Sequence, residues 1–130
     1  MKQHKQTNAV VYFELPVIDM ERAITFYQNL FGYTFEREFI DGYEMAFFPL
    51  DENAPGITGA LAKGDVYQPS HEGAILYFNT ANIDAVLEKA VALSSTILYP
   101  KTNNNNYCFT IAEIEDSEGN RIALKQVHKN

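Results

Sequence analysis

The chain repeats its own pattern at a spacing of 63 residues. When residues 10–64 are laid over residues 73–127, the stretch VVYFELPVIDMERAITFYQNLFGY falls on GAILYFNTANIDAVLEKAVALSST, and PGITGAL falls on EGNRIAL. Such self-similarity indicates one supersecondary unit used twice, because a single copy leaves an apolar face uncovered. Two copies are too few for a solenoid. We therefore expect one pseudo-symmetric domain with a site where its halves meet.

Each copy predicts a strand, a helix and three further strands. In the first copy, Asp19 is a good N-cap, Gly32 suits the end of the helix, and Asp41-Gly42 favours a tight hairpin turn. The expected elements are strand 9–17, a helix from about 19, strands 33–40, 43–49 and 57–63, then strand 74–80, a helix from about 82 to 93, and strands near 96–99, 107–114 and 120–127. The single domain, residues 1–130, thus contains module one (about 9–64), a linker loop (64–73) and module two (about 73–127).

Residues of alternating character separate two faces of these strands, because successive side chains of a strand point to opposite sides. One set is purely apolar and belongs under the helices: Phe13, Leu15, Val17, Leu76, Phe78, Ile122 and Leu124. The other set faces a cup or solvent: Tyr12, Glu14, Pro16, Ile75, Tyr77, Asn79, Arg121, Ala123 and Lys125. Strands 43–49 and 107–114 are apolar on both faces, so the sequence leaves their cup side open.

The composition restricts the class of protein. A chain of 130 residues with 46% hydrophobic residues is typical of one globular domain. Ten basic residues against 17 acidic ones give a net charge of −7, which disfavours nucleic acid as a partner. No apolar run is long enough to span a membrane, and the first residues lack a secretory apolar core, so we expect no membrane association. The single cysteine, Cys108, excludes an intrachain disulfide, is expected to be a small core residue, and fits the reducing cytoplasm.

Several of these stretches together resemble a known family. ELPVIDMERAITFYQNLFGY, GALAKG, ILYFNTANIDAVLEKA, YPKT and EDSEGNRIAL, between about residues 9 and 126, are similar to the glyoxalase/bleomycin-resistance/extradiol-dioxygenase proteins, the vicinal oxygen chelate superfamily. The resemblance implies an α+β fold in which two tandem βαβββ modules form one eight-stranded, cup-shaped sheet with helices on its convex side. It also implies that the cup is often completed in a homodimer.

The resemblance further implies where a metal would bind. The enzymes of the superfamily hold a divalent ion with His, Gln or Glu side chains from the first and last strand of each module. The corresponding positions in this chain are Tyr12, Ala60, Ile75 and Ala123. Only Tyr12 offers an oxygen, and a divalent ion needs several carboxylate or imidazole donors. We therefore predict no metal ligands and no other cofactor.

Five residues on the predicted cup face are candidates for a ligand site. Glu14 is the strongest candidate among them. It is either a general base in a partly apolar pocket or a structural acid paired with a base such as Lys125. Tyr12 and Tyr77 either hold a small ligand or fill the space that a metal would occupy. Asn79 and Lys125 lie nearer the strand ends, where solvent exposure is the ordinary alternative to a ligand role.

Two classes of function follow from these residues. In the first, a metal-independent protein binds a small, partly aromatic or amphiphilic molecule in its cup, as the drug-sequestering members of the superfamily do. In the second, a metal-independent lyase or isomerase uses Glu14 as its general base while Tyr12 or Tyr77 stabilises developing charge. A metal-dependent glyoxalase or dioxygenase is the third reading, and the four residues at the ligand positions disfavour it. We favour binding, because one carboxylate without a visible acid partner is thin support for catalysis.

Overall fold

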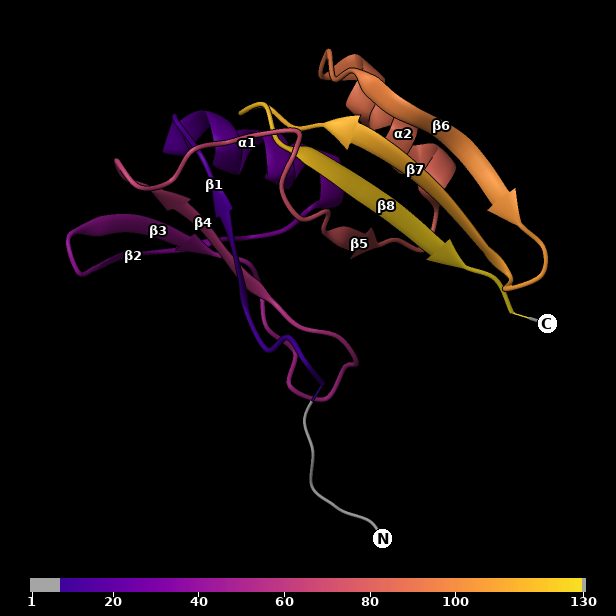
Figure 1. Ribbon diagram of the computed structural model, residues 1–130, viewed down its shortest axis with the longest axis horizontal. Helices are drawn as coiled ribbons and strands as arrows, with labels where there is room; N and C mark the ends of the chain where they lie inside the picture. The colour runs from indigo at the N-terminus through magenta and orange to yellow at the C-terminus, as the bar shows by residue number, and fades with distance from the viewer. Residues whose placement is uncertain (1–7, 130) are drawn as a thin grey trace, which may run out of the picture.

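A computed structural model describes residues 8–129 of the chain (Figure 1). Residues 1–7 and 130, and with them most of the N-terminal segment predicted to lack a secretory apolar core, lie outside the described residues. Two helices and eight strands follow in the order β1 (Phe13–Pro16), α1 (Met20–Phe31), β2 (Glu36–Ile40), β3 (Tyr43–Phe47), β4 (Gly59–Lys63), β5 (Tyr77–Asn79), α2 (Ile83–Ala92), β6 (Ile97–Asn104), β7 (Phe109–Glu115) and β8 (Arg121–Val127). This order is the predicted tandem βαβββ arrangement.

The two helices begin where the sequence predicts. Asp19 caps α1 by accepting a hydrogen bond from the backbone N–H of Arg22, and Asn82 caps α2 by accepting one from Ala85. Gly32 ends α1 in the left-handed conformation, with φ at 81°. The hairpin between β2 and β3 turns at Asp41 and Gly42, which both have positive φ, as a type I′ turn requires.

The strands form two four-stranded sheets, ordered β1-β4-β3-β2 and β5-β8-β7-β6. In the first sheet β1 runs parallel to β4 with Glu14 opposite Ala60, and in the second β5 runs parallel to β8 with Tyr77 opposite Ala123. These pairs differ by the predicted 63 residues. The predicted α+β class with two tandem βαβββ modules is confirmed, but the expected single eight-stranded sheet is divided into two sheets, because within the described residues no hydrogen bonds join β1 and β5 at the seam.

The third strands of the modules depart from the repeat. Phe47 faces Ala60 in the first sheet, whereas Glu113 faces Ala123 in the second, so these strands are offset by 66 residues (113 against 47). The β6–β7 hairpin is also longer than predicted, because pairing continues to Asn104 opposite Phe109 through two register shifts. Part of the polar run 103–106, expected as a loop, therefore belongs to a strand.

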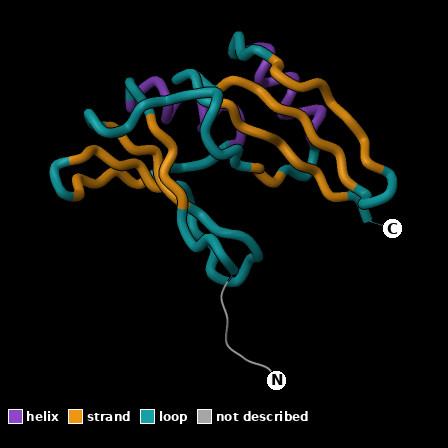
Figure 2. Tube along the Cα trace, viewed as in Figure 1, coloured by secondary structure: helices purple, strands orange, loops and turns teal. Residues whose placement is uncertain are grey.

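The inner edge strands are shorter than predicted. Residues 9–12 and 74–76 lie outside β1 and β5. Residues 8–12 instead run beside the loop 49–58, and the two segments together project from the body as a finger (Figure 2). A hydrogen bond from the Thr58 hydroxyl to the carbonyl of Pro49 closes the base of that loop.

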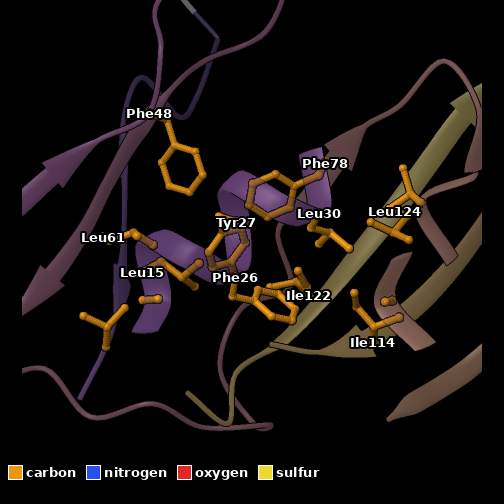
Figure 3. Close-up of a cluster of buried hydrophobic side chains, with 14 of the residues drawn as sticks. Leu15, Phe26, Tyr27, Leu30, Phe48, Leu61, Phe78, Ile114, Ile122 and Leu124 are labelled. Carbon is orange, nitrogen blue, oxygen red and sulfur yellow. The ribbon is translucent and has the colours of Figure 1, made fainter. Parts of the chain in front are cut away.

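One buried core draws on both modules (Figure 3). Leu15, Tyr27, Leu30, Phe48 and Leu61 of the first module belong to the same cluster as Phe78, Ile114, Ile122 and Leu124 of the second. The helices cover this side of the sheets, as the alternation along β1, β5 and β8 predicts. We call the opposite side of each sheet its open face. Among the described residues, no helix has the length and apolar character needed to cross a membrane.

Polar contacts also join the modules across the core. Glu118, in the turn between β7 and β8, accepts hydrogen bonds from the backbone N–H groups of Ile18 and Asp19, each at 2.8 Å, and from the Arg22 guanidinium. The hydroxyl of the buried Tyr27 donates to Asp116 at 2.6 Å. The start of α1 is thus tied to the closing turn of the second module.

Candidate functional site

The open face of the first sheet has a floor of small and apolar side chains. Strand pairing aligns Phe47, Ala60 and Glu14 in one row, and Met45, Ala62 and Pro16 in the next. Paired residues share a face, so Met45 and Phe47 lie on the open side, which the sequence left undecided. Met45, Ala60 and Ala62 are buried there, because Tyr43, Phe47 and Tyr67 pack over them.

Glu14 stands on this face between two tyrosines. The Tyr12 hydroxyl donates to one carboxylate oxygen at 3.1 Å, and the Tyr67 hydroxyl donates to the other at 2.6 Å. Tyr67 in turn meets the ring of Tyr43 edge to face, with the ring centroids 5.5 Å apart. We call Glu14 with Tyr12, Tyr43 and Tyr67 the tyrosine–glutamate cluster.

Both hydroxyls of the cluster remain donors over a wide pH range. Partial burial, then the hydrogen bond to Glu14, raises the pKa of Tyr12 to about 12. The hydrogen bond to Glu14, then partial burial, raises the pKa of Tyr67 to about 12 as well. A phenolate beside a carboxylate is unfavourable because two negative charges would share the site. At neutral pH the cluster therefore combines neutral rings with a single carboxylate.

The surroundings of Glu14 differ from both expectations. The side chain is exposed rather than enclosed in an apolar pocket, because β1 is an edge strand whose open face lacks a covering layer. The expected structural pairing with Lys125 is also wrong for the described residues: Lys125 lies on the second sheet, with its ammonium 4.7 Å from the centre of the Phe109 ring. Tyrosine hydroxyls take the place of the expected base.

The other predicted site residues lie together on the second sheet. Tyr77 and Asn79 are on β5, and Asn79 pairs with Lys125 of β8. On the same open face, Glu113 is bound by the Arg121 guanidinium. Beside that pair, Glu115 lies 3.0 Å from a ring nitrogen of His71. The contacts thus bring together Tyr12 and Glu14 on one sheet, and Tyr77, Asn79 and Lys125 on the other.

A cavity of about 480 Å³ opens at the seam between the two sheets. Its walls are largely aromatic and apolar, and come from both modules: Phe13, Tyr33, Phe48, Pro49 and the loop 55–58 on one side, and the stretch 75–79 on the other. Tyr77 and Asn79, two of the predicted ligand residues, line it. Phe13 of β1 lines it as well, with its ring on the core side of the strand, opposite to the face that carries Tyr12 and Glu14.

The residues at the metal positions do not fit a divalent ion. The register places Ala60 and Ala123 at the middle of the paired strands, and neither carries a donor atom. Over residues 8–129, no three His, Cys, Asp or Glu side chains gather in a way that could hold a metal ion. The donor set at these positions is therefore unlike that of a metal centre.

Sequence reasoning missed Tyr67. It lies in the linker loop, 53 residues from Glu14 along the chain, and loops carry no periodic pattern that reveals a contact.

The prediction that Cys108 is a small core residue is wrong. It is partly exposed and lies in the turn between β6 and β7 with φ at 59°, because closing this hairpin needs a left-handed residue.

The two tandem βαβββ modules, in which the first strand pairs in parallel with the last, define the class of protein. A family model described as the glyoxalase/bleomycin resistance protein/dioxygenase superfamily matches residues 9–124. The chain belongs to this superfamily. Comparison with curated proteins finds no significant match.

Solved structures of the same fold are similar over most of this chain. A glyoxylase/bleomycin resistance protein/dioxygenase domain from Frankia sp. EAN1pec has a TM-score of 0.72 and 15% identity over 95% of this chain and 100% of its own. The trypanothione-dependent glyoxalase I of Leishmania major has a TM-score of 0.68 and 16% identity over 91% and 86%. For a mutant of glyoxalase I from Zea mays the values are 0.63 and 18% over 89% and 45%. At these identities the likeness shows the fold alone.

Proposed function

We propose that this protein binds a small, partly aromatic or amphiphilic molecule without a metal, at the seam of its two modules. The observation that carries the proposal is the cavity of about 480 Å³, whose aromatic and apolar walls come from both modules. Pockets of this size with a few polar groups on apolar walls are typical of small-molecule sites. Asn79 and the hydroxyl of Tyr77 are available to orient a ligand there. The lone cysteine suits a reducing compartment, and the proposal places the protein in the cytoplasm.

The surroundings of Glu14 favour binding over the alternative of a lyase or isomerase. A general base needs an open oxygen within reach of the proton that it removes. Each carboxylate oxygen of Glu14 already accepts a hydrogen bond from a tyrosine hydroxyl. One lone pair remains on each oxygen, but the carboxylate is exposed to water, whereas proton transfer in an active site is favoured where water is excluded.

Filling the cavity should abolish binding without unfolding the protein. We expect Ile75→Trp, which places an indole at the cavity wall, to reduce the affinity for small aromatic compounds such as 2-phenylethanol at least tenfold. Val91→Trp is the matched control, because Val91 is 63% exposed on α2, away from the cavity lining. Ligand-observed NMR gives the affinity and a thermal melt reports folding. Absence of any binding by the unmodified protein, or equal binding by the Ile75→Trp variant, would contradict the proposal.

A second copy of the chain is the proposed partner. The finger exposes several large apolar side chains, with Val11 at 69% and Leu50 at 64% exposure, and Val10 and Ile57 beside them. Next to the seam, β1 and β5 are open sheet edges, which proteins commonly cover with a partner. We therefore propose a homodimer in which the finger of each chain packs on the other.

The dimer is expected to be stable at micromolar concentration and to depend on the finger. Leu50→Asp should weaken self-association at least tenfold, because it puts a charge into an apolar contact. Val91→Asp, at an equally exposed apolar residue on α2, should leave association unchanged. Sedimentation velocity over a concentration series measures both. A monomeric unmodified protein, or equal weakening by the two variants, would reject the finger as the interface.

A further inference from the structure

The two open faces carry different charge. The strands of the first sheet present the carboxylates of Glu14, Glu36 and Glu38 on this side, because Glu36 pairs with Phe47 and Glu38 with Met45. Its basic residues lie on the other face: Arg37 binds Glu21 and Glu44 there, and Lys63 pairs with Glu44. Across residues 8–129, no ion pair involves the three open-face carboxylates.

The open face of the second sheet is compensated instead. Arg121 pairs with Glu113, and His71 lies against Glu115. Lys125 adds a positive charge over the ring of Phe109. An approaching cation therefore meets a favourable potential over the first sheet and a balanced one over the second. The asymmetry singles out the first sheet.

The tyrosine–glutamate cluster adds aromatic rings to this charge. Its two hydroxyls hold the carboxylate of Glu14 between them, each donating to a different oxygen. Tyr43 is fixed beside them, because its ring packs against Gly64, where a Cβ atom would lie only 2.1 Å from the ring. Electron-rich tyrosine rings attract ammonium groups, and a neighbouring carboxylate strengthens the attraction.

We propose that the tyrosine–glutamate cluster binds the ammonium group of an organic cation, while the apolar part of that ligand enters the neighbouring cavity. This inference rests on the proposed function and adds the ligand's charge to it. An organic ammonium fits better than a metal ion, because one carboxylate among tyrosines lacks the oxygen ligands that a hard cation needs. Glu14 stands on β1, the strand on the first module's side of the seam, and Tyr77 and Asn79, which line the cavity, stand on β5 across it.

Three probes of similar size and different charge test the inference. Phenethylammonium is the cation, 2-phenylethanol is the neutral analogue, and 3-phenylpropanoate is the anion. Titration calorimetry at low ionic strength should show the cation binding at least fivefold more tightly than the alcohol, and the anion more weakly than either. Added salt should reduce this preference, because the attraction to Glu14 is exposed to solvent.

A variant pair locates the preference. Glu14→Gln keeps the size of the side chain and removes its charge, so it should abolish the preference for the cation over 2-phenylethanol. Glu88→Gln, on an exposed part of α2, removes the same charge at a distance and should retain the preference. A melting temperature close to that of the unmodified protein confirms that Glu14→Gln leaves the fold intact.

The outcomes separate this inference from the proposed function. Equal binding of the cation and the alcohol by the unmodified protein overturns the charge inference and leaves the binding proposal standing. A preference that survives in Glu14→Gln overturns the assignment to the cluster. Absence of binding by all three probes counts against the binding proposal itself, and the inference falls with it.

Discussion

Glu118→Ala should lower the free energy of unfolding by about 2–4 kcal/mol, although Glu118 lies in a turn far from the proposed site. Its side chain is fully buried and receives hydrogen bonds from Ile18, Asp19, Ser117 and Arg22. Alanine leaves two backbone N–H groups at the start of α1 without an acceptor. Arg22 contributes less to the loss, because its side chain is 53% exposed and turns to water.

Urea denaturation followed by circular dichroism measures this change. Glu88→Ala is the matched control, because Glu88 is exposed on α2 and its replacement should alter stability by less than about 0.5 kcal/mol. Equal stability of the two variants would show that the contact between the start of α1 and the β7–β8 turn contributes nothing to the joining of the modules.

The same residue gives the stability a pH dependence. Burial alone would raise the pKa of Glu118, but the hydrogen bonds from Arg22, Asp19, Ser117 and Ile18 outweigh it and lower the pKa from 4.5 to about 2. The stabilisation by Glu118 is therefore complete above pH 4.5 and is lost as the pH falls toward 2. For Asp116 the balance is reversed: burial outweighs the hydrogen bonds from Tyr27 and Asn120 and raises the pKa of that carboxyl. Removing Glu118 should thus flatten the loss of stability in acid.

The internal repeat made the central architecture predictable. A 63-residue offset aligns Glu14 with Tyr77 and Ala60 with Ala123, and the strand register agrees with it, since Glu14 lies opposite Ala60 and Tyr77 opposite Ala123. Helix caps and the Asp41-Gly42 turn are local signals that depend on one or two residues. Alternation also assigned Tyr12 and Glu14 to one face, and their hydrogen bond agrees with it.

Contacts between distant parts of the chain were not predictable in this way. Tyr67 reaches Glu14 from a loop, where the side-chain direction follows no period. The 66-residue offset of β7 arises because the connection after β3 is longer than the one after β7. The 63-residue repeat aligns the first and last strands of the two modules and does not reveal this difference in length. Burial of Glu14 was expected from the cup of the family, but an edge strand in a single chain leaves that face open.

Gly59→Ala should cost about 3 kcal/mol or more, since overpacking against backbone has little room to relax. Gly59 begins β4 opposite Phe13 of β1, and a Cβ atom there would lie 2.1 Å from the Phe13 carbonyl oxygen and 2.7 Å from its ring. The strand that carries Tyr12 and Glu14 would have to move away from the sheet. We therefore expect the variant to lose both stability and the preference for a cationic ligand.

Gly73→Ala is the control for this change. Gly73 has open space around its Cα atom and needs no left-handed conformation, so alanine should be neutral there or stabilising by up to about 1 kcal/mol. Urea denaturation compares the two variants, and amide shifts of residues 12–16 report whether β1 has moved. If Gly59→Ala were as stable as Gly73→Ala and bound phenethylammonium equally well, close packing of β1 on β4 would not be what positions Glu14. The site would then tolerate a displaced edge strand, and its geometry would have to come from Tyr67 and the linker loop.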